Sequence, residues 1–257
     1  TRASGSVAGT GAGAGADTGR LWGEEGVTSL GPLARPVGFV LNLVAELLRI
    51  QGKDAYFPPR EAKRLLKTLF LEAGLNGLGA TESLRGEVEG LCCTLETTNP
   101  TPRAALSPLM NGFWRLLYTD LPATAPNPSN GRLGPFTGDV FQSLDSNQGQ
   151  IKNILRITPI PGFPLEILGA LTATQTVHAP DTWDIEFLRV GNSIAGIALP
   201  PKQFAPGSQI RRWRITYLDD NFRILRAFNP FPLPGAGAEE LLFVFSRETE
   251  DVFEVTV

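Results

Sequence analysis

Asn111-Gly-Phe-Trp-Arg-Leu-Leu-Tyr-Thr-Asp120 and Gly131-Arg-Leu-Gly-Pro-Phe-Thr-Gly-Asp-Val-Phe-Gln-Ser-Leu-Asp145 are the two segments that decide the fold. In the first segment, Trp114, Leu116 and Tyr118 lie on one face of a predicted strand, because successive side chains of a strand point to opposite sides. The second segment opens with a loop punctuated by glycine and proline and continues into another predicted strand. The sequence before these segments is helical or loose, and the sequence after them is strand-like.

Short strands separated by turns are predicted for the rest of the chain. A turn signal at Asn147-Gln-Gly149 predicts a hairpin between 139–144 and 150–158. Alternating apolar residues predict further strands at 170–178, 182–190, 210–218, 222–228, 240–246 and 252–257. The fold class is therefore mainly β, and about eight to ten antiparallel strands favour a closed barrel, because closure removes the sheet edges. A barrel of about eight strands either holds one small apolar ligand or is filled by its own side chains.

A helical segment and a tail are predicted before the barrel. We divide the chain into a flexible or partner-bound tail at 1–35, a helical segment at 36–107 and a β-barrel at 108–257. Helices are predicted at 36–50, 58–75 and 81–96, with Thr81 as N-cap of the third. The start at Thr1, without Met, is expected to be a processed end. In the second helix, the residues expected to face inward are Leu65, Leu66, Leu69, Phe70 and Leu71.

Two apolar features are predicted to contact partners. The helix at 36–50 has one narrow polar stripe and an apolar arc too wide for a free surface helix, so it docks on its own domain or contacts a partner protein or a membrane. A second feature is the proline-rich loop that follows the strand at 222–228 and carries large apolar side chains. The residues expected to contact partners are Phe39, Val40, Leu43, Leu47, Phe228, Phe231 and Leu233.

Composition argues against several classes of function. A chain of 257 residues with 42% hydrophobic residues is predicted to be globular, and its net charge of −3 argues against binding to nucleic acid. The two cysteines, Cys92 and Cys93, are adjacent, and His178 is the single histidine. They provide neither a disulfide framework nor a metal-binding pattern, so we predict no metal and no catalytic residue. No apolar run is long enough to cross a membrane as a helix.

Several motifs occur in a fixed order along the chain. Leu95-Glu-Thr-Thr-Asn-Pro-Thr-Pro102 precedes a Gly-x-Trp-x-Leu-x-Tyr-Thr strand that begins at Gly112, and Thr216-Tyr-Leu-Asp219 precedes Phe222-Arg-Ile-Leu-Arg226. The further matching residues are Gly131, Arg132, Gly134, Pro135, Gly138, Asp139, Gln142, Asn153, Asp219, Arg223 and Arg226. Together these motifs resemble those of the plastid lipid-associated proteins, also called fibrillins or plastoglobulins, over residues 58–246.

The resemblance implies a lipocalin-like barrel in a chloroplast protein without catalytic activity. It implies association with the thylakoid membrane, at its periphery or stromal side, or with plastoglobule lipid droplets, and binding of a lipid, prenyl-quinone or carotenoid. One departure concerns the sequence after Arg226, where the family usually continues with Gly-Asp-Gly into a strand and this chain instead has the proline-rich loop. The departure favours a specialised member held in a complex with other protein subunits.

Three functions stay open on the sequence. The first is a lipid- or pigment-binding barrel, although the same side chains could simply form its core. The second is a structural or assembly subunit of a large thylakoid membrane complex, such as a photosynthetic complex, with a side-chain-filled barrel. The third is an enzyme, but we expect Asp139 and Asp219 to cap turns or pair with Arg132, Arg223 or Arg226 instead. The residues predicted to line a ligand are Trp114, Leu116, Tyr118, Trp183, Ile185, Phe187, Trp213, Ile215 and Tyr217.

Overall fold

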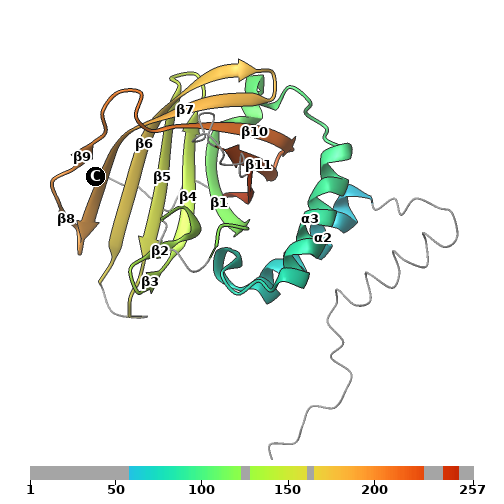
Figure 1. The fold of residues 1–257 in the computed structure, drawn as a ribbon, viewed down its shortest axis with the longest axis horizontal. Coiled ribbons are helices and arrows are strands. Elements are labelled where there is room, and N and C mark those ends of the chain that lie inside the picture. Colours follow the sequence, from blue (N-terminus) through green and yellow to red (C-terminus); the bar gives the residue numbers. More distant parts are fainter. Residues whose placement is uncertain (1–57, 123–127, 161–164, 229–239, 249–257) are drawn as a thin grey trace, which may run out of the picture. The chain divides into compact units, whose positions relative to one another are not determined.

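A computed structural model describes residues 58–122, 128–160, 165–228 and 240–248 (Figure 1). The chain divides into two units, 1–35 and 36–257, and every described residue belongs to the second. The predicted tail at 1–35, the helix at 36–50, the loop residues Phe231 and Leu233, and the strand at 252–257 lie outside the described residues.

Eight antiparallel strands form a closed barrel, as predicted. Their order around the barrel is β10-β11-β12-β1-β4-β5-β6-β7, and pairing of β7 with β10 closes the ring. The strands are β1 (Gly112–Thr119), β4 (Asp139–Asp145), β5 (Gln150–Ile157), β6 (Ile167–Ala179), β7 (Thr182–Ile194), β10 (Ile210–Leu218), β11 (Phe222–Phe228) and β12 (Leu241–Glu248). Four two-residue strands lie outside the ring, namely β2 (Arg132–Leu133), β3 (Phe136–Thr137), β8 (Ile197–Ala198) and β9 (Lys202–Gln203).

Two helices, α2 (Pro59–Ala73) and α3 (Glu82–Thr97), cover the outer face of β10, β11, β12 and β1. Pro59 at the first position of α2 and the Thr81 cap of α3, whose Oγ1 accepts from Leu84 N at 3.3 Å, explain where they begin. The prediction that Leu71 faces inward is wrong: it is 84% exposed, because residue 71 falls on the outer side of the α2 arc that its buried neighbours define. No helix in the described segments is long and apolar enough to cross a membrane.

Ion pairs fix both helices to the barrel. Lys63 on α2 contacts Asp219 with an Nζ–Oδ2 distance of 2.6 Å. Arg226 on β11 contacts Glu89 and Glu96 on α3, each at 2.7 Å. Burial acts to lower the pKa of Arg226, but its hydrogen bonds to the two glutamates outweigh burial and raise that pKa. Asp219 and Arg226 are therefore docking residues for the helices.

A short plug closes one end of the barrel. It contains the 3₁₀ helices η2 (Ala104–Leu106) and η3 (Pro108–Met110). The indole Nε1 of Trp183 donates to the carbonyl of Ala105 at 2.8 Å, and that of Trp114 donates to the carbonyl of Met110 at 3.0 Å. Two buried tryptophans thus satisfy backbone carbonyls that would otherwise lose their hydrogen bonds in the core.

Two β-bulges change the direction of two predicted inward residues. The register shifts between Leu116 and Tyr118 in β1, and between Ile215 and Tyr217 in β10. An extra residue in a strand interrupts the period-two alternation. Tyr118 and Tyr217 therefore pack outward with the helices, where the ring of Tyr118 stacks on Phe70 at 5.4 Å, so the prediction of one shared face is wrong for both tyrosines.

Candidate functional site

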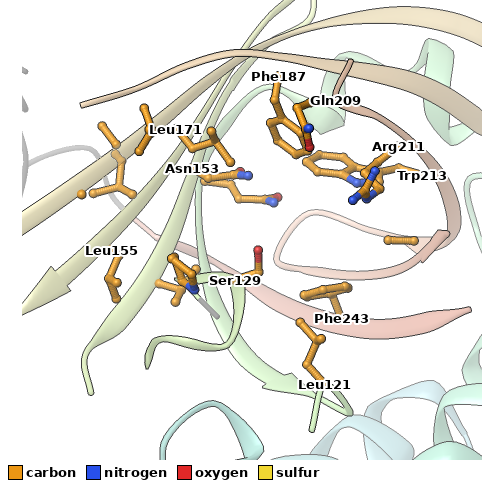
Figure 2. Close-up of a pocket in the computed structure, with 18 of the residues that line it drawn as sticks. Leu121, Ser129, Asn153, Leu155, Leu171, Phe187, Gln209, Arg211, Trp213 and Phe243 are labelled. Carbon is orange, nitrogen blue, oxygen red and sulfur yellow. The ribbon is translucent and has the colours of Figure 1, made fainter. Parts of the chain in front are cut away.

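A cavity of about 790 Å³ occupies the half of the barrel that lies away from the plug (Figure 2). The last residues of β5, β7 and β11 form part of its wall, and the first residues of β4, β6, β10 and β12 form the rest. Because neighbouring strands are antiparallel, all these strand ends meet at the same end of the barrel, opposite the plug. Pro128 and Ser129 of η4 (Pro128–Asn130) also contribute to the wall. A volume of this size is in the range of about 300–1,000 Å³ that small-molecule sites occupy.

The described residues that line the cavity are mainly apolar, and none of them is acidic. The apolar wall includes Leu155, Leu171, Phe187, Val190, Trp213 and Phe243. Polar side chains are few, and they are Ser129, Gln142, Asn153, Asn192, Gln209 and Arg211. Among the described lining residues, Arg211 is the one that carries a charge. Apolar walls with a few polar groups suit an amphipathic molecule better than a sugar or a nucleotide.

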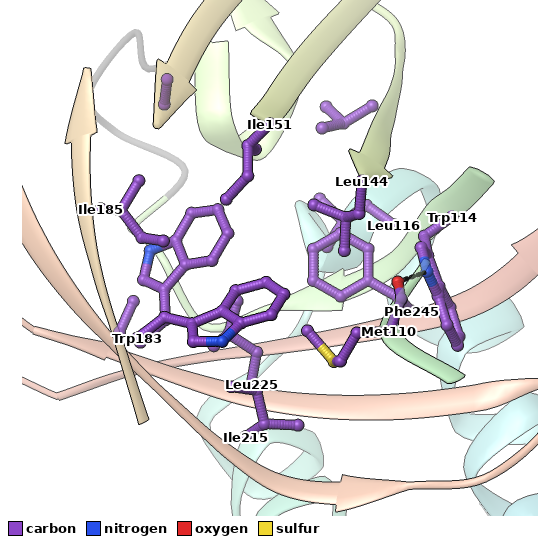
Figure 3. Close-up of a cluster of buried hydrophobic side chains, with 14 of the residues drawn as sticks. Met110, Trp114, Leu116, Leu144, Ile151, Trp183, Ile185, Ile215, Leu225 and Phe245 are labelled. Carbon is purple, nitrogen blue, oxygen red and sulfur yellow. Dashed lines mark hydrogen bonds between the residues drawn. The ribbon is translucent and has the colours of Figure 1, made fainter. Parts of the chain in front are cut away.

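The nine residues predicted to line a ligand fall into three groups. Phe187 and Trp213 line the cavity. Tyr118 and Tyr217 face the helices. The remaining five fill the core between the cavity and the plug (Figure 3), and they are Trp114, Leu116, Trp183, Ile185 and Ile215. Contact of any of the nine with a ligand stays a prediction.

Sequence reasoning missed much of the wall, including Leu155, Leu171, Val190, Gln209 and Arg211. Leu171 lies in a strand that was predicted, but its direction follows only from the register with Asn153 and Val190. Val190 faces inward because β7 skips Leu188 in its pairing with β6, which moves the alternation by one residue. Arg211 could have been found, because it is two residues before Trp213 and so shares its face.

A buried arginine lies beneath the cavity. Arg223 is 0% exposed and donates from Nη2 to Oε1 of Gln142, which lines the cavity. The guanidinium of Arg223 is 4.7 Å from the ring centroid of Trp114, and that of Arg247 is 4.3 Å from the same ring. Arg247 also donates to the carbonyls of Asn111 and Leu109. Aromatic faces thus stabilise two cations, of which Arg223 is fully buried and Arg247 is partly exposed.

The other residues of the ordered motifs have structural contacts. Asp139 pairs with Arg115 at 2.7 Å, and Asp219 pairs with Lys63 and caps the β10–β11 turn by accepting from Phe222 N at 2.9 Å. The expected turn cap is confirmed for Asp219. The expected arginine partners are wrong for both carboxylates, because Asp139 pairs with Arg115, and Asp219 with Lys63, instead of Arg132, Arg223 or Arg226. Arg223 points into the barrel and Arg226 pairs with two glutamates of α3. The remaining motif residues lie at the start of β1 (Gly112) and in or beside the β2–β3 hairpin (Gly131, Arg132, Gly134, Pro135 and Gly138).

The four titratable residues that were considered for catalysis lie away from the cavity. His178 lies near the end of β6, where its Nδ1 is 3.2 Å from Oδ2 of Asp184. None of Asp139, His178, Asp219 and Asp220 lines the cavity. Within the described ranges, no group of three or more His, Cys, Asp or Glu side chains could hold a metal ion. Burial raises the pKa of the Cys92 thiol well above its ordinary value, so this cysteine is a poor nucleophile.

Comparison with known proteins identifies the family. The PAP_fibrillin family model matches residues 60–229, a span that includes most of the barrel and both described helices. The chain belongs to the PAP_fibrillin family. The plug and the helix-docking ion pairs lie within the residues that match the PAP_fibrillin model, and so does most of the cavity wall.

Individual PAP_fibrillin relatives are distant in sequence. The chain is 24% identical over 221 residues to "Probable plastid-lipid-associated protein 2, chloroplastic" of Arabidopsis thaliana, covering 69% of this chain and 71% of the relative. It is 32% identical over 130 residues to "Probable plastid-lipid-associated protein 3, chloroplastic" of Oryza sativa subsp. japonica, covering 49% of this chain and 33% of the relative. It is 28% identical over 209 residues to "Chromoplast-specific carotenoid-associated protein C1, chromoplastic" of an Oncidium hybrid cultivar, covering 64% and 65%. These names support a plastid location for this chain.

Proposed function

We propose that this chain is a non-enzymatic plastid protein that binds one amphipathic lipid in the open half of its barrel. The observation that carries the proposal is the apolar cavity of about 790 Å³ in the half of the barrel that the plug does not fill. The names of the relatives, which describe lipid and carotenoid association, support the same class of ligand. A lipid tail gains free energy on leaving water in proportion to the apolar area that it buries, and the wall supplies that area.

Ligand binding in the cavity can be tested with a substitution that fills the cavity with a larger side chain. Leu171 faces the cavity from β6, and its neighbour Thr172 faces outward. We expect Leu171→Trp to weaken binding of the neutral fluorescent polyene diphenylhexatriene by about tenfold or more, because loss of a few apolar contacts corresponds to at least about 1.4 kcal/mol. Thr172→Trp is the matched control and should bind as the wild type does. Equal binding by both variants would contradict a ligand site in the barrel.

Exposed apolar side chains surround the open end and support association with a lipid surface. They are contributed by the β2–β3 hairpin, the β5–β6 loop and the β7–β8 region, and they are Leu133, Phe136, Ile160, Ile194, Ile197 and Leu199. We call these residues the mouth rim. Leu133 of the mouth rim also lines the cavity, so the rim offers a lipid an apolar path from a surface into the barrel.

If the mouth rim contacts a lipid surface, a charge introduced on it should weaken binding to vesicles. Ile197 is 71% exposed on β8, and Val177 is 49% exposed near the opposite, plugged end of the barrel. Burying one isoleucine contributes about 1.5–3 kcal/mol, so Ile197→Asp should reduce co-flotation with phosphatidylcholine vesicles by about tenfold or more. Val177→Asp should float as the wild type does. The mouth rim is not the contact if the two variants float alike.

The alternative of a subunit in a large thylakoid complex depends mostly on residues outside the described segments, namely the tail, the helix at 36–50 and the loop residues Phe231 and Leu233. Phe228, which was also expected to contact a partner, ends β11 and lines the cavity. The subunit role therefore stays a prediction.

A further inference from the structure

A polar cluster lies at the floor of this mainly apolar cavity. Gln142 on β4 and Asn153 on β5 are directly opposite each other in the strand register, and both line the cavity. Figure 2 shows the side chain of Asn153 directed into the cavity. Arg223 on β11 lies below Gln142 and donates to it. We call Gln142, Asn153 and Arg223 the floor cluster.

The two amides of the floor cluster offer hydrogen-bond donors to a ligand. Because Oε1 of Gln142 accepts from Arg223, its NH₂ group is the end left for the cavity. The side chain of Asn153 lines the cavity and makes no hydrogen bond to another residue that the structure describes, so its NH₂ group is free to donate to a ligand. Two adjacent amide nitrogens favour a ligand with oxygen atoms that accept hydrogen bonds.

Arg223 adds a positive charge that no carboxylate of the described residues pairs with. Among the described residues, its Nε and Nη1 atoms have no hydrogen-bond partner, although its guanidinium stacks on Trp114 and lies 4.5 Å from the ring centroid of Phe245. Burial and the nearby charge of Arg247 lower the pKa of Arg223 to about 9, so its side chain remains cationic at neutral pH. Arg211 is a second cation in the cavity wall, and the described residues of the lining include no Asp or Glu. The positive charges of Arg223 and Arg211 therefore favour binding of an anion in the cavity.

We propose that the cavity binds a long-chain lipid with a carboxylate head, and that the floor cluster holds this head. The inference rests on the proposed function and specifies its ligand. The carboxylate accepts hydrogen bonds from the NH₂ groups of Gln142 and Asn153 and supplies the negative charge that buried Arg223 lacks. The acyl chain lies against Leu171 and Phe187 and points to the mouth. A hydrocarbon polyene would leave the floor cluster without a partner, so it is the weaker ligand.

Arg223 is a positioning residue in this arrangement. Its side chain does not line the cavity, and it acts through the Gln142 amide, whose oxygen it holds away from the ligand. Arg223→Met removes the charge and retains an apolar side chain of similar length. The variant removes a buried cation but also leaves Oε1 of Gln142 without its donor, so its thermal unfolding midpoint is measured beside its affinities, and unchanged hexadecane binding shows that the barrel is folded.

The test compares three ligands that differ only at the head. Hexadecanoate, its methyl ester and hexadecane, each delivered from cyclodextrin, compete with bound diphenylhexatriene on the full chain. We expect the acid to bind about tenfold more tightly than the ester, since a charge-assisted hydrogen bond is about twice as strong as a neutral one, and the ester to bind more tightly than the hydrocarbon. Equal binding of all three would overturn the head-group inference but leave the proposed function intact. Failure of all three and of the polyene would overturn the proposed function itself.

Variants locate the head within the cavity. Gln142→Leu and Arg223→Met should each reduce the affinity for the acid to that for the ester and leave the affinity for hexadecane unchanged, whereas Arg223→Lys should keep part of the acid preference. Ser143→Ala, on the exposed outer face of β4, is the matched control and should behave as the wild type does. If Arg211→Met abolishes the acid preference and Gln142→Leu retains it, the head lies at the mouth and the floor assignment is wrong.

Discussion

Trp114→Ala is expected to cost about 3–5 kcal/mol of folding free energy, the range measured for removing a buried tryptophan or phenylalanine. Trp114 is 0% exposed and belongs to the core between the cavity and the plug. Its removal leaves a large cavity, leaves the carbonyl of Met110 without its donor, and withdraws the aromatic face on which Arg223 and Arg247 lie. A cost this large is a substantial part of the stability of an ordinary domain.

The measurement for Trp114 is urea unfolding of three variants. Trp114→Phe keeps most of the apolar volume and loses the indole donor, so it should cost about 1–3 kcal/mol, the penalty for an unpaired buried polar group. Leu71→Ala, at a residue that is 84% exposed, should change stability by less than about 0.5 kcal/mol. If Trp114→Ala were as stable as Leu71→Ala, the plug and core described above would not be the centre of the fold.

Gly138→Ala is expected to destabilise the barrel by about 1–3 kcal/mol or more, because the added methyl group has no room. A Cβ at this position would lie 2.0 Å from the carbonyl oxygen of Arg156 and 2.7 Å from Cγ1 of Ile157. The same glycine accepts from Asn76 Nδ2 at 2.9 Å and donates to the carbonyl of Gly131 at 2.9 Å. Displacing Gly138 therefore disturbs both the start of β4 and the contact of η1 (Leu75–Gly77) with the barrel.

A glycine in α3 provides the control for Gly138. Gly86 lies on the helix, and a Cβ there would meet no atom within 4 Å. Alanine favours the helix over glycine by about 0.5–1 kcal/mol, so Gly86→Ala should raise the midpoint of thermal unfolding while Gly138→Ala lowers it. Midpoints that moved in the same direction would show that the close approach at Gly138 does not limit stability.

The barrel could be predicted because its evidence is local. Alternation around Trp183 and Trp213, and the turn at Asn147-Gln-Gly149, each follow from the period of a strand or the chemistry of a turn. The β4–β5 hairpin and the inward direction of Trp183 and Ile185 are accordingly as expected. Closure into a barrel followed from the number of antiparallel strands and the need to remove sheet edges.

The cavity could not be predicted to the same extent, because it depends on where the alternation breaks. The bulges near Tyr118 and Tyr217 turn these residues outward, and the skipped Leu188 turns Val190 inward. No local pattern marks a bulge that tertiary packing imposes. The plug adds a second long-range effect, since it fills one half of the barrel and so separates core residues such as Trp183 from wall residues such as Trp213.

The most direct test of lipid binding is native mass spectrometry of the chain recovered from plastids. The account predicts that the wild type and Thr172→Trp carry the added mass of one lipid per chain, and that Leu171→Trp, in which the cavity is filled, carries none. Fragmentation of the released lipid should then yield a carboxylate. If the wild type carries no added mass, or if Leu171→Trp carries as much lipid as Thr172→Trp does, the cavity is not the binding site and the account is contradicted.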